Sequence, residues 1–171
     1  MKIEQAAERL LADCNIKKVP IPVDKIAKHL RATITYEPFN GDDCMSGVLI
    51  REEAKTVIGI NSSHGETRQR FTIAHEIGHL VLKHKGDIFV DKTVRTYRNS
   101  KSSQAVDRNE IDANGFAAAL LMPQALLIKE LEKIPANQRG INIAEHLASV
   151  FEVSQQAMEY RLSNLGITIP G

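Results

Sequence analysis

Apolar residues recur at helical spacing at the start of the chain and then give way to short β-branched runs. Residues 3–12 have the period of an amphipathic helix, and residues 24–30 predict a second, shorter one. Runs rich in Val, Ile and Thr at 32–36, 46–50 and 55–60 predict three strands, the last two joined as a hairpin. This part of the chain therefore predicts a small three-stranded sheet beside two short helices.

Helical spacing returns after the third strand. Small or apolar residues at this spacing predict a helix that begins near 64–67 and ends near 83–86: Phe71, Ala74, Ile77, Gly78 and Val81. Further helices are expected at 106–122, 123–133, 143–151 and 155–165, with a linker at 135–140. The predicted class is α+β and mainly helical. Residues 1–134 would form the main domain, and residues 135–171 a helix-turn-helix-like segment packed on it.

Composition narrows the class of protein. The chain has 171 residues, 43% of them hydrophobic, and a net charge of +1. It can therefore bury a core, and its charge gives no general attraction to nucleic acid or membrane. Two cysteines do not make a disulfide framework, no apolar run approaches a membrane span, and the first residues do not form a signal peptide. A cytoplasmic location without membrane attachment is expected.

The charge of the C-terminal segment bears on DNA binding. Residues 141–171 contain one cation, Arg161, against three glutamates. A DNA-binding helix-turn-helix needs cations that face phosphate. The segment therefore favours packing or partner recognition, and direct DNA binding is not expected.

A His-Glu-x-x-His motif, formed by His75, Glu76 and His79, lies in the helix predicted after the third strand. Residues four apart share one helix face, so both histidines can hold one metal ion. Glu76 is rotated about 100° from His75, beside the ion, where a base for a metal-bound water would have to be. The alternative is two solvent-facing or hydrogen-bonded histidines on an ordinary helix. A catalytic site also needs a third protein ligand.

The helix predicted at 106–122 offers that ligand. Glu110 and Asn114 are four residues apart and share a face, whereas Asp107 and Asp112 fall on other faces. Glu110 could supply a carboxylate ligand, and Asn114 could accept the ring N–H of a metal-bound histidine. By spacing alone, a solvated first-turn glutamate stabilised by the helix dipole fits Glu110 equally well.

The segment 83–108 is polar, lacks a clear period, and carries seven Lys or Arg against three Asp. The favoured interpretation is a solvated loop. The alternative is a mobile flap that engages an acidic or unfolded substrate, in which Tyr97 or His84 could donate a hydrogen bond to an oxyanion.

Two further hypotheses concern residues that precede the motif. Cys44 could cap the open metal position as a thiolate, although an ordinary loop or core cysteine is the favoured interpretation. The strand at 55–60 leads into the motif helix, so an extended peptide could pair with a strand beside this helix.

Three stretches together resemble the ImmA/IrrE family of zinc metallopeptidases. They are Arg70-Phe71-Thr72-Ile73-Ala74-His75-Glu76-Ile77-Gly78-His79, Glu110-x-x-Ala113-Asn114-x-Phe116-Ala117, and Leu120-Leu121-Met122-Pro123. The resemblance reaches from the Ser46-Gly47 hairpin to Leu165-Gly166 and so covers nearly the whole chain.

This resemblance implies a zincin-like domain with a gluzincin-like site. His75, His79 and Glu110 would bind Zn2+, and Glu76 would act as general base. Such proteins cleave a partner transcriptional repressor, often of the helix-turn-helix type and encoded nearby, and so release stress, mobile-element or defence genes.

Two functions of another class compete with the peptidase. The chain could be a non-enzymatic DNA- or protein-binding regulator, such as an antitoxin or repressor, with a structural or vestigial metal site. It could also be a metal-binding scaffold that sequesters a partner without cutting it. The acidic C-terminal segment disfavours the DNA-binding regulator. The intact Glu76 disfavours the scaffold, because retention of a metal ion alone would not require it.

Overall fold

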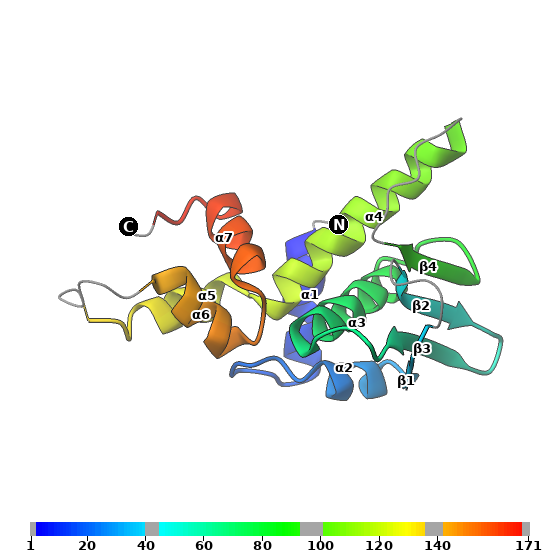
Figure 1. Cartoon of the computed structure of the whole chain (residues 1–171), viewed down its shortest axis with the longest axis horizontal. Helices are drawn as coiled ribbons and strands as arrows, with labels where there is room; N and C mark the ends of the chain where they lie inside the picture. Colours follow the sequence, from blue (N-terminus) through cyan, green and yellow to red (C-terminus); the bar gives the residue numbers. More distant parts are fainter. Residues whose placement is uncertain (1–2, 40–44, 93–100, 136–141, 169–171) are drawn as a thin grey trace.

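The computed structural model describes residues 3–39, 45–92, 101–135 and 142–168; of residues 91–92 and 101–107 it describes the backbone alone. These residues form a mixed α+β structure (Figure 1), which confirms the predicted class. In chain order the elements are α1 (Ile3–Asp13), α2 (Val23–His29), β1 (Ala32–Glu37), β2 (Met45–Arg51), β3 (Thr56–Asn61), α3 (Glu66–Val81), β4 (Ile88–Lys92), α4 (Lys101–Leu121), α5 (Gln124–Leu131), α6 (Ile143–Phe151) and α7 (Gln155–Asn164).

The sheet in the described part of the chain has four strands, in the order β1-β3-β2-β4, so the prediction of three was wrong. β4 lies in the segment 83–108, which the sequence indicated as a solvated loop. Its apolar run is only three residues long, and Ile88 and Val90 stay exposed. Such a run shows no clear period. The strand is defined by pairing with β2, in which Phe89 lies opposite Leu49.

Strand β3 is an inner strand, paired in parallel with β1 and antiparallel with β2. The strand that leads into the motif helix therefore has no free edge for an added peptide. Among the strands that the structure describes, β1 and β4 are at the edges of the sheet. Order along the chain did not reveal this, because β1 pairs with β3 and not with its neighbour in sequence.

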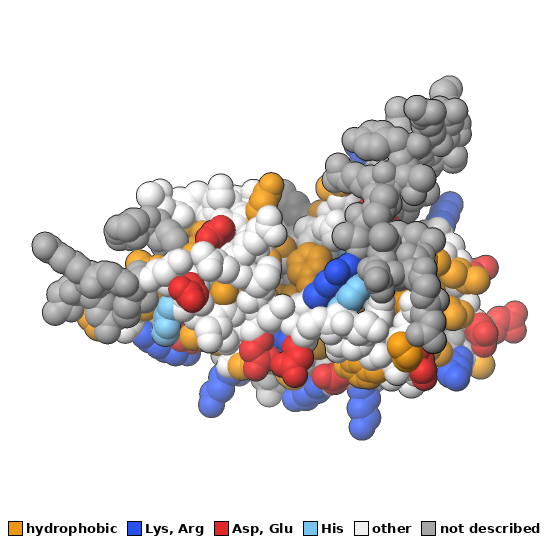
Figure 2. Space-filling model, in the orientation of Figure 1, with side chains coloured by type: hydrophobic (Ala, Val, Ile, Leu, Met, Phe, Trp, Pro, Cys, Tyr) orange, Lys and Arg blue, Asp and Glu red, His pale blue; other side chains and the backbone are white. Residues whose placement is uncertain are grey.

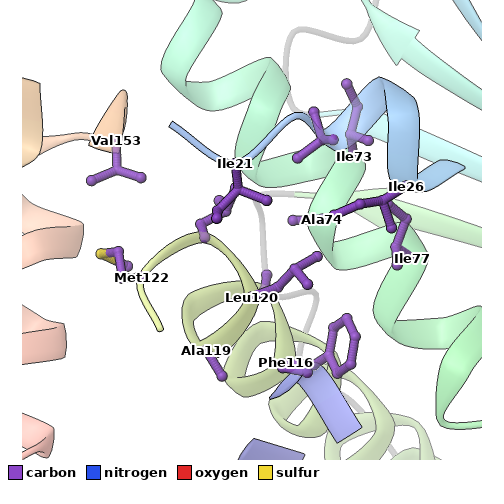
Figure 3. Close-up of a cluster of buried hydrophobic side chains, with 14 of the residues drawn as sticks. Ile21, Ile26, Ile73, Ala74, Ile77, Phe116, Ala119, Leu120, Met122 and Val153 are labelled. Carbon is purple, nitrogen blue, oxygen red and sulfur yellow. The ribbon is translucent and has the colours of Figure 1, made fainter. Parts of the chain in front are cut away.

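Helix α3 lies between the sheet and α4 (Figure 1). Figure 3 shows Ile73, Ala74 and Ile77 of α3 beside Phe116 and Leu120 of α4, and all five are almost completely buried. Burial of each large side chain contributes about 1.5–3 kcal/mol of transfer free energy. The apolar face that predicted α3 thus fixes it at the centre of the protein.

Helix α4 begins at Lys101, five residues before the predicted start. Its first turn is Lys-Ser-Ser-Gln, which carries no apolar period. Its later turns carry small and apolar residues that pack on α1 and α3. Periodicity could therefore detect only the packed part of this helix.

The C-terminal helices are tied to the rest of the protein through Arg161. The Arg161 guanidinium is buried, donates to the Met122 carbonyl oxygen at 2.9 Å and pairs with Glu4 at 2.5 Å. The cation predicted to be alone in its segment is thus bound internally and does not face a phosphate. The helix-turn-helix likeness of α6 and α7 and the division after residue 134 stay predictions.

No single helix in the described ranges is long and apolar enough to cross a membrane. A bent pair, Arg108–Leu121 with Gln124–Leu131, passes the same test of length and composition only when its two members are taken together. Its large apolar residues include Phe116, Leu120 and Leu127, which belong to the buried core.

Gly78 marks a close approach of α3 to α4. A Cβ atom at this position would lie 3.2 Å from both Cα and the carbonyl oxygen of Ala113 and 3.2 Å from Phe116 Cδ1. Backbone atoms of a buried helix cannot move aside without shifting the helix. We therefore expect Gly78→Ala to lower the free energy of unfolding by about 1–3 kcal/mol, measured by denaturant titration.

The matched control is Gly115→Ala on α4. Its Cβ would lie 3.6 Å from Ile3 Cδ1, an ordinary contact, so we expect no loss of stability and a gain of up to about 1 kcal/mol from helix propensity. Equal stability of Gly78→Ala and wild type would contradict the close packing.

Candidate metal centre

His75, His79 and Glu110 come together at the contact of α3 with α4. The two histidines are buried, and their Nε2 atoms lie 3.0 Å apart. Glu110 Oε2 lies 3.1 Å from His75 Nε2, and Oε1 lies 3.4 Å from His79 Nε2. The structure thus joins two histidines of one helix with a carboxylate 31 residues after the second of them.

These three side chains fit a metal ion. One ligand atom from each lies within 4.8 Å of the others. Ligand atoms about 2.0–2.1 Å from a tetrahedral ion are roughly 3.3 Å from one another, close to the separations found here. Two imidazoles and one carboxylate also leave a fourth position for water or substrate, as in catalytic sites.

The charge of Glu110 depends on this cluster. Burial raises the pKa of the carboxyl group, but hydrogen bonds from His75 and His79 and their positive charge lower it, to about 2 overall. The carboxylate is therefore ionised at neutral pH. A metal ion bound through Nε2 of both histidines would take the place of these hydrogen bonds.

Asn114 fixes the orientation of the His75 ring. His75 Nδ1 lies 2.9 Å from Asn114 Oδ1, and an amide oxygen can only accept a hydrogen bond. If His75 binds a metal ion as a neutral ring, its proton is therefore on Nδ1 and its Nε2 lone pair is free for the ion. This is the geometry that the predicted role of Asn114 requires.

His84 was expected as a hydrogen-bond donor to an oxyanion, and the structure places its ring against His79 instead. It is buried behind His79, and its Nδ1 is 2.9 Å from His79 Nδ1. Burial, followed by the charge of His79, lowers the pKa of His84. The nitrogen predicted to serve an oxyanion thus contacts a metal-site histidine. Tyr97, the other candidate oxyanion donor, and Cys44, the candidate thiolate cap, lie outside the described residues.

Glu76 is completely buried, and its carboxylate lies between α3 and β2. A Cβ on Gly47 of β2 would be 3.3 Å from Glu76 Oε1 and 2.4 Å from Thr72 Cγ2. Gly47 therefore provides the space in which this carboxylate fits. A glycine inside a strand is a known signal of close approach, and this signal could have identified Gly47 from the sequence.

A cavity of about 740 Å3 adjoins the cluster, between α3, α4 and α7. Its wall is mostly apolar and includes Phe71, Ala118, Met122 and Ala157. Asn114 belongs both to this wall and to the histidine cluster. Figure 2 shows the hollow between the C-terminal helices and α4, with hydrophobic side chains at its base.

A buried His-Glu-x-x-His helix joined by a glutamate from a second helix defines the metallopeptidase class of site. The chain matches the Peptidase_M78 family model, described as the IrrE N-terminal-like domain, over residues 27–163. It belongs to this family, and the predicted ImmA/IrrE relationship is confirmed.

Two curated relatives illustrate the relationship. The chain is 36% identical over 107 residues to the radiation response metalloprotease IrrE of Deinococcus radiodurans, a match that covers 63% of this chain and 30% of the relative. It is 27% identical over 122 residues to the metallopeptidase ImmA of Bacillus subtilis, covering 71% of this chain and 64% of ImmA. The chain thus spans less than two thirds of the length of each.

A solved structure supports the fold. A Mycobacterium tuberculosis transcriptional regulator superposes with a TM-score of 0.64 and 17% sequence identity, covering 94% of this chain and 46% of that chain. At this identity the likeness concerns the fold alone.

Removal of single ligands tests the cluster. We expect His79→Ala and Glu110→Ala to lose bound metal, because two ligands of the three do not hold an ion tightly. Glu76→Gln should keep its metal, since Glu76 is not one of the three. The measurement is the metal content of the purified protein by elemental analysis.

An exposed histidine on α6 provides the control. We expect His146→Ala to keep the wild-type metal content, since its side chain lies on the surface, away from the cluster. A full metal content in Glu110→Ala would exclude Glu110 as the third ligand.

Proposed function

We propose that this protein is a zinc-dependent endopeptidase that cleaves a partner transcriptional repressor at a specific site. The observation that carries the proposal is the convergence of His75, His79 and Glu110, with Glu76 next to the first ligand on the same helix. Membership of a metallopeptidase family supports the same activity.

The proposed chemistry divides between the metal and Glu76. A zinc ion held by the three ligands would supply a Lewis acid, which lowers the pKa of water to about 7 and polarises the scissile carbonyl. Glu76 would take a proton from the attacking water and pass it to the leaving amine. Asn114 would keep Nε2 of His75 available by holding the ring through Nδ1.

The substrate we propose is a protein, most simply a helix-turn-helix repressor encoded near this chain. Two features support an extended polypeptide. β4 is an edge strand whose backbone can pair with a peptide, and its Phe89 stacks on the metal-site residue His79 with ring centroids 4.5 Å apart. The apolar cavity between α3, α4 and α7 could hold large side chains of the same substrate.

Co-expression tests the activity. We expect a defined fragment of the adjacent repressor with wild-type protein and none with Glu76→Gln, because the amide cannot accept the proton. Mass spectrometry of the fragment gives the cleaved bond.

The other outcomes separate the competing functions. A stable complex without a fragment from either variant would favour a non-enzymatic binding protein. A fragment from both variants would contradict the role of Glu76 as general base.

The cavity can be tested by filling it. Gln156 is exposed on α7 and lines the cavity, whereas the adjacent Gln155 is exposed but does not line it. We expect Gln156→Trp to reduce repressor cleavage about tenfold, or ~1.4 kcal/mol of binding free energy, and Gln155→Trp to leave it unchanged. Equal cleavage by the two variants would exclude the cavity from substrate binding.

A further inference from the structure

We propose that His84 is a positioning residue for the metal ligand His79: it accepts a hydrogen bond from His79 Nδ1–H and so directs His79 Nε2 at the metal. This inference rests on the metal site of the proposed function. It concerns metal binding and not the identity of the substrate.

The geometry of the two rings carries the proposal. The Nδ1 atoms of His79 and His84 are 2.9 Å apart, and the rings meet edge to face with centroids 5.0 Å apart. A hydrogen bond at this distance needs one proton between the two nitrogens. When His79 binds a metal ion through Nε2, that nitrogen carries no proton, so the proton of the neutral ring is on Nδ1. His84 Nδ1 must then be the acceptor.

The two metal histidines are therefore held in the same manner. His75 donates through Nδ1 to Asn114 of α4, and His79 donates through Nδ1 to His84, which follows the end of α3. Groups that accept the second ring N–H of a metal-bound histidine fix its tautomer and orientation, and loss of such a group typically weakens metal binding 10–100-fold.

His84 is itself fixed by the surrounding structure. The Arg51 guanidinium at the end of β2 donates to the backbone carbonyl oxygens of His84 and Gly86. The same guanidinium lies over the Phe89 ring, 5.1 Å from its centroid, and Phe89 stacks on His79. The His79 ring is thus held on one side by the hydrogen bond to His84 and on the other by stacking on Phe89. Arg51 of β2 contacts both His84 and Phe89.

Lys83 makes this arrangement possible. It has a φ of 55°, in the left-handed region, and the following residue His84 donates its backbone N–H to the carbonyl oxygen of His79 at 3.2 Å. The chain thereby turns back against the last turn of α3. This reversal is what brings the His84 ring behind His79 and not into solvent.

The test compares two substitutions of His84. In His84→Asn, Oδ1 is as many bonds from Cβ as the imidazole Nδ1 and can only accept, as Asn114 does for His75. His84→Leu keeps the volume and burial but has no acceptor. Zinc affinity is measured by competition with a chelator, with the exposed-histidine variant His146→Leu as the control.

We expect a 10–100-fold weaker zinc affinity for His84→Leu, an affinity within about threefold of wild type for His84→Asn, and no change for His146→Leu. Thermal unfolding with and without zinc gives a second readout. The lost contact orients a ligand. His84→Leu should therefore reduce the rise in melting temperature on adding zinc by more degrees than it lowers the melting temperature of the metal-free protein.

Wild-type zinc affinity in His84→Leu would overturn the proposal. The proposal would also be overturned if His84→Asn and His84→Leu lost zinc affinity equally and their metal-free melting temperatures fell equally. That pattern would show that His84 acts through packing alone. All these measurements are made without substrate. Absence of proteolysis in the wild type would therefore contradict the proposed function and leave this inference intact.

Discussion

The close packing of α3 against α4 is the contact on which the site depends. The absence of a side chain at Gly78 lets the backbone of Ala113 approach α3 so closely that a Cβ atom would fit only if its neighbours shifted. On α4, Glu110 lies three residues before Ala113 and Asn114 one residue after it, and at this helix separation both reach His75. A wider helix pair would keep both histidines on α3 but leave the carboxylate and the amide too far away. The metal ligands are thus positioned by a contact between apolar surfaces and not by their mutual attraction, which the desolvation of a buried charge would largely offset.

The second constraint comes from the sheet. Glu76 projects toward β2, where Gly47 leaves room for its carboxylate, while His79 is supported by Phe89 of β4. α3 therefore presents its ligands toward α4 and its proposed base toward the sheet. This division follows from the helix period, since adjacent residues are rotated by about 100°.

The sequence predicts those parts of the site that lie on single helices. The spacing of His75 and His79, and of Glu110 and Asn114, follows from helical geometry, and the apolar period places both helices in the core. The contacts between elements could not be obtained in this way. β4 is short and exposed at Ile88, so it lacks a period, and the roles of Arg51 and Phe89 arise only when β2 and β4 pair. The sequence suggested His84 only as a possible oxyanion donor, because the direction of its ring depends on the backbone reversal at Lys83, which spacing does not encode.

The supports of the two histidines differ in their place along the chain, and this difference has a physical consequence. His75 is held by α4, so its orientation depends on the helix pair, whereas His79 is held by residues of β2, of β4 and of the turn after α3. The two Nε2 atoms converge only if the helix pair and the sheet are both in place. In an unfolded chain neither support exists, and two histidines four residues apart would bind a metal ion weakly through many conformations. The folded protein is therefore preorganised for metal binding, because His75, His79 and Glu110 already lie at ligand separations. Such preorganisation lets the bound metal stabilise the packing that creates its site, because metal binding requires the α3–α4 contact and an ion that binds only the folded state stabilises that state.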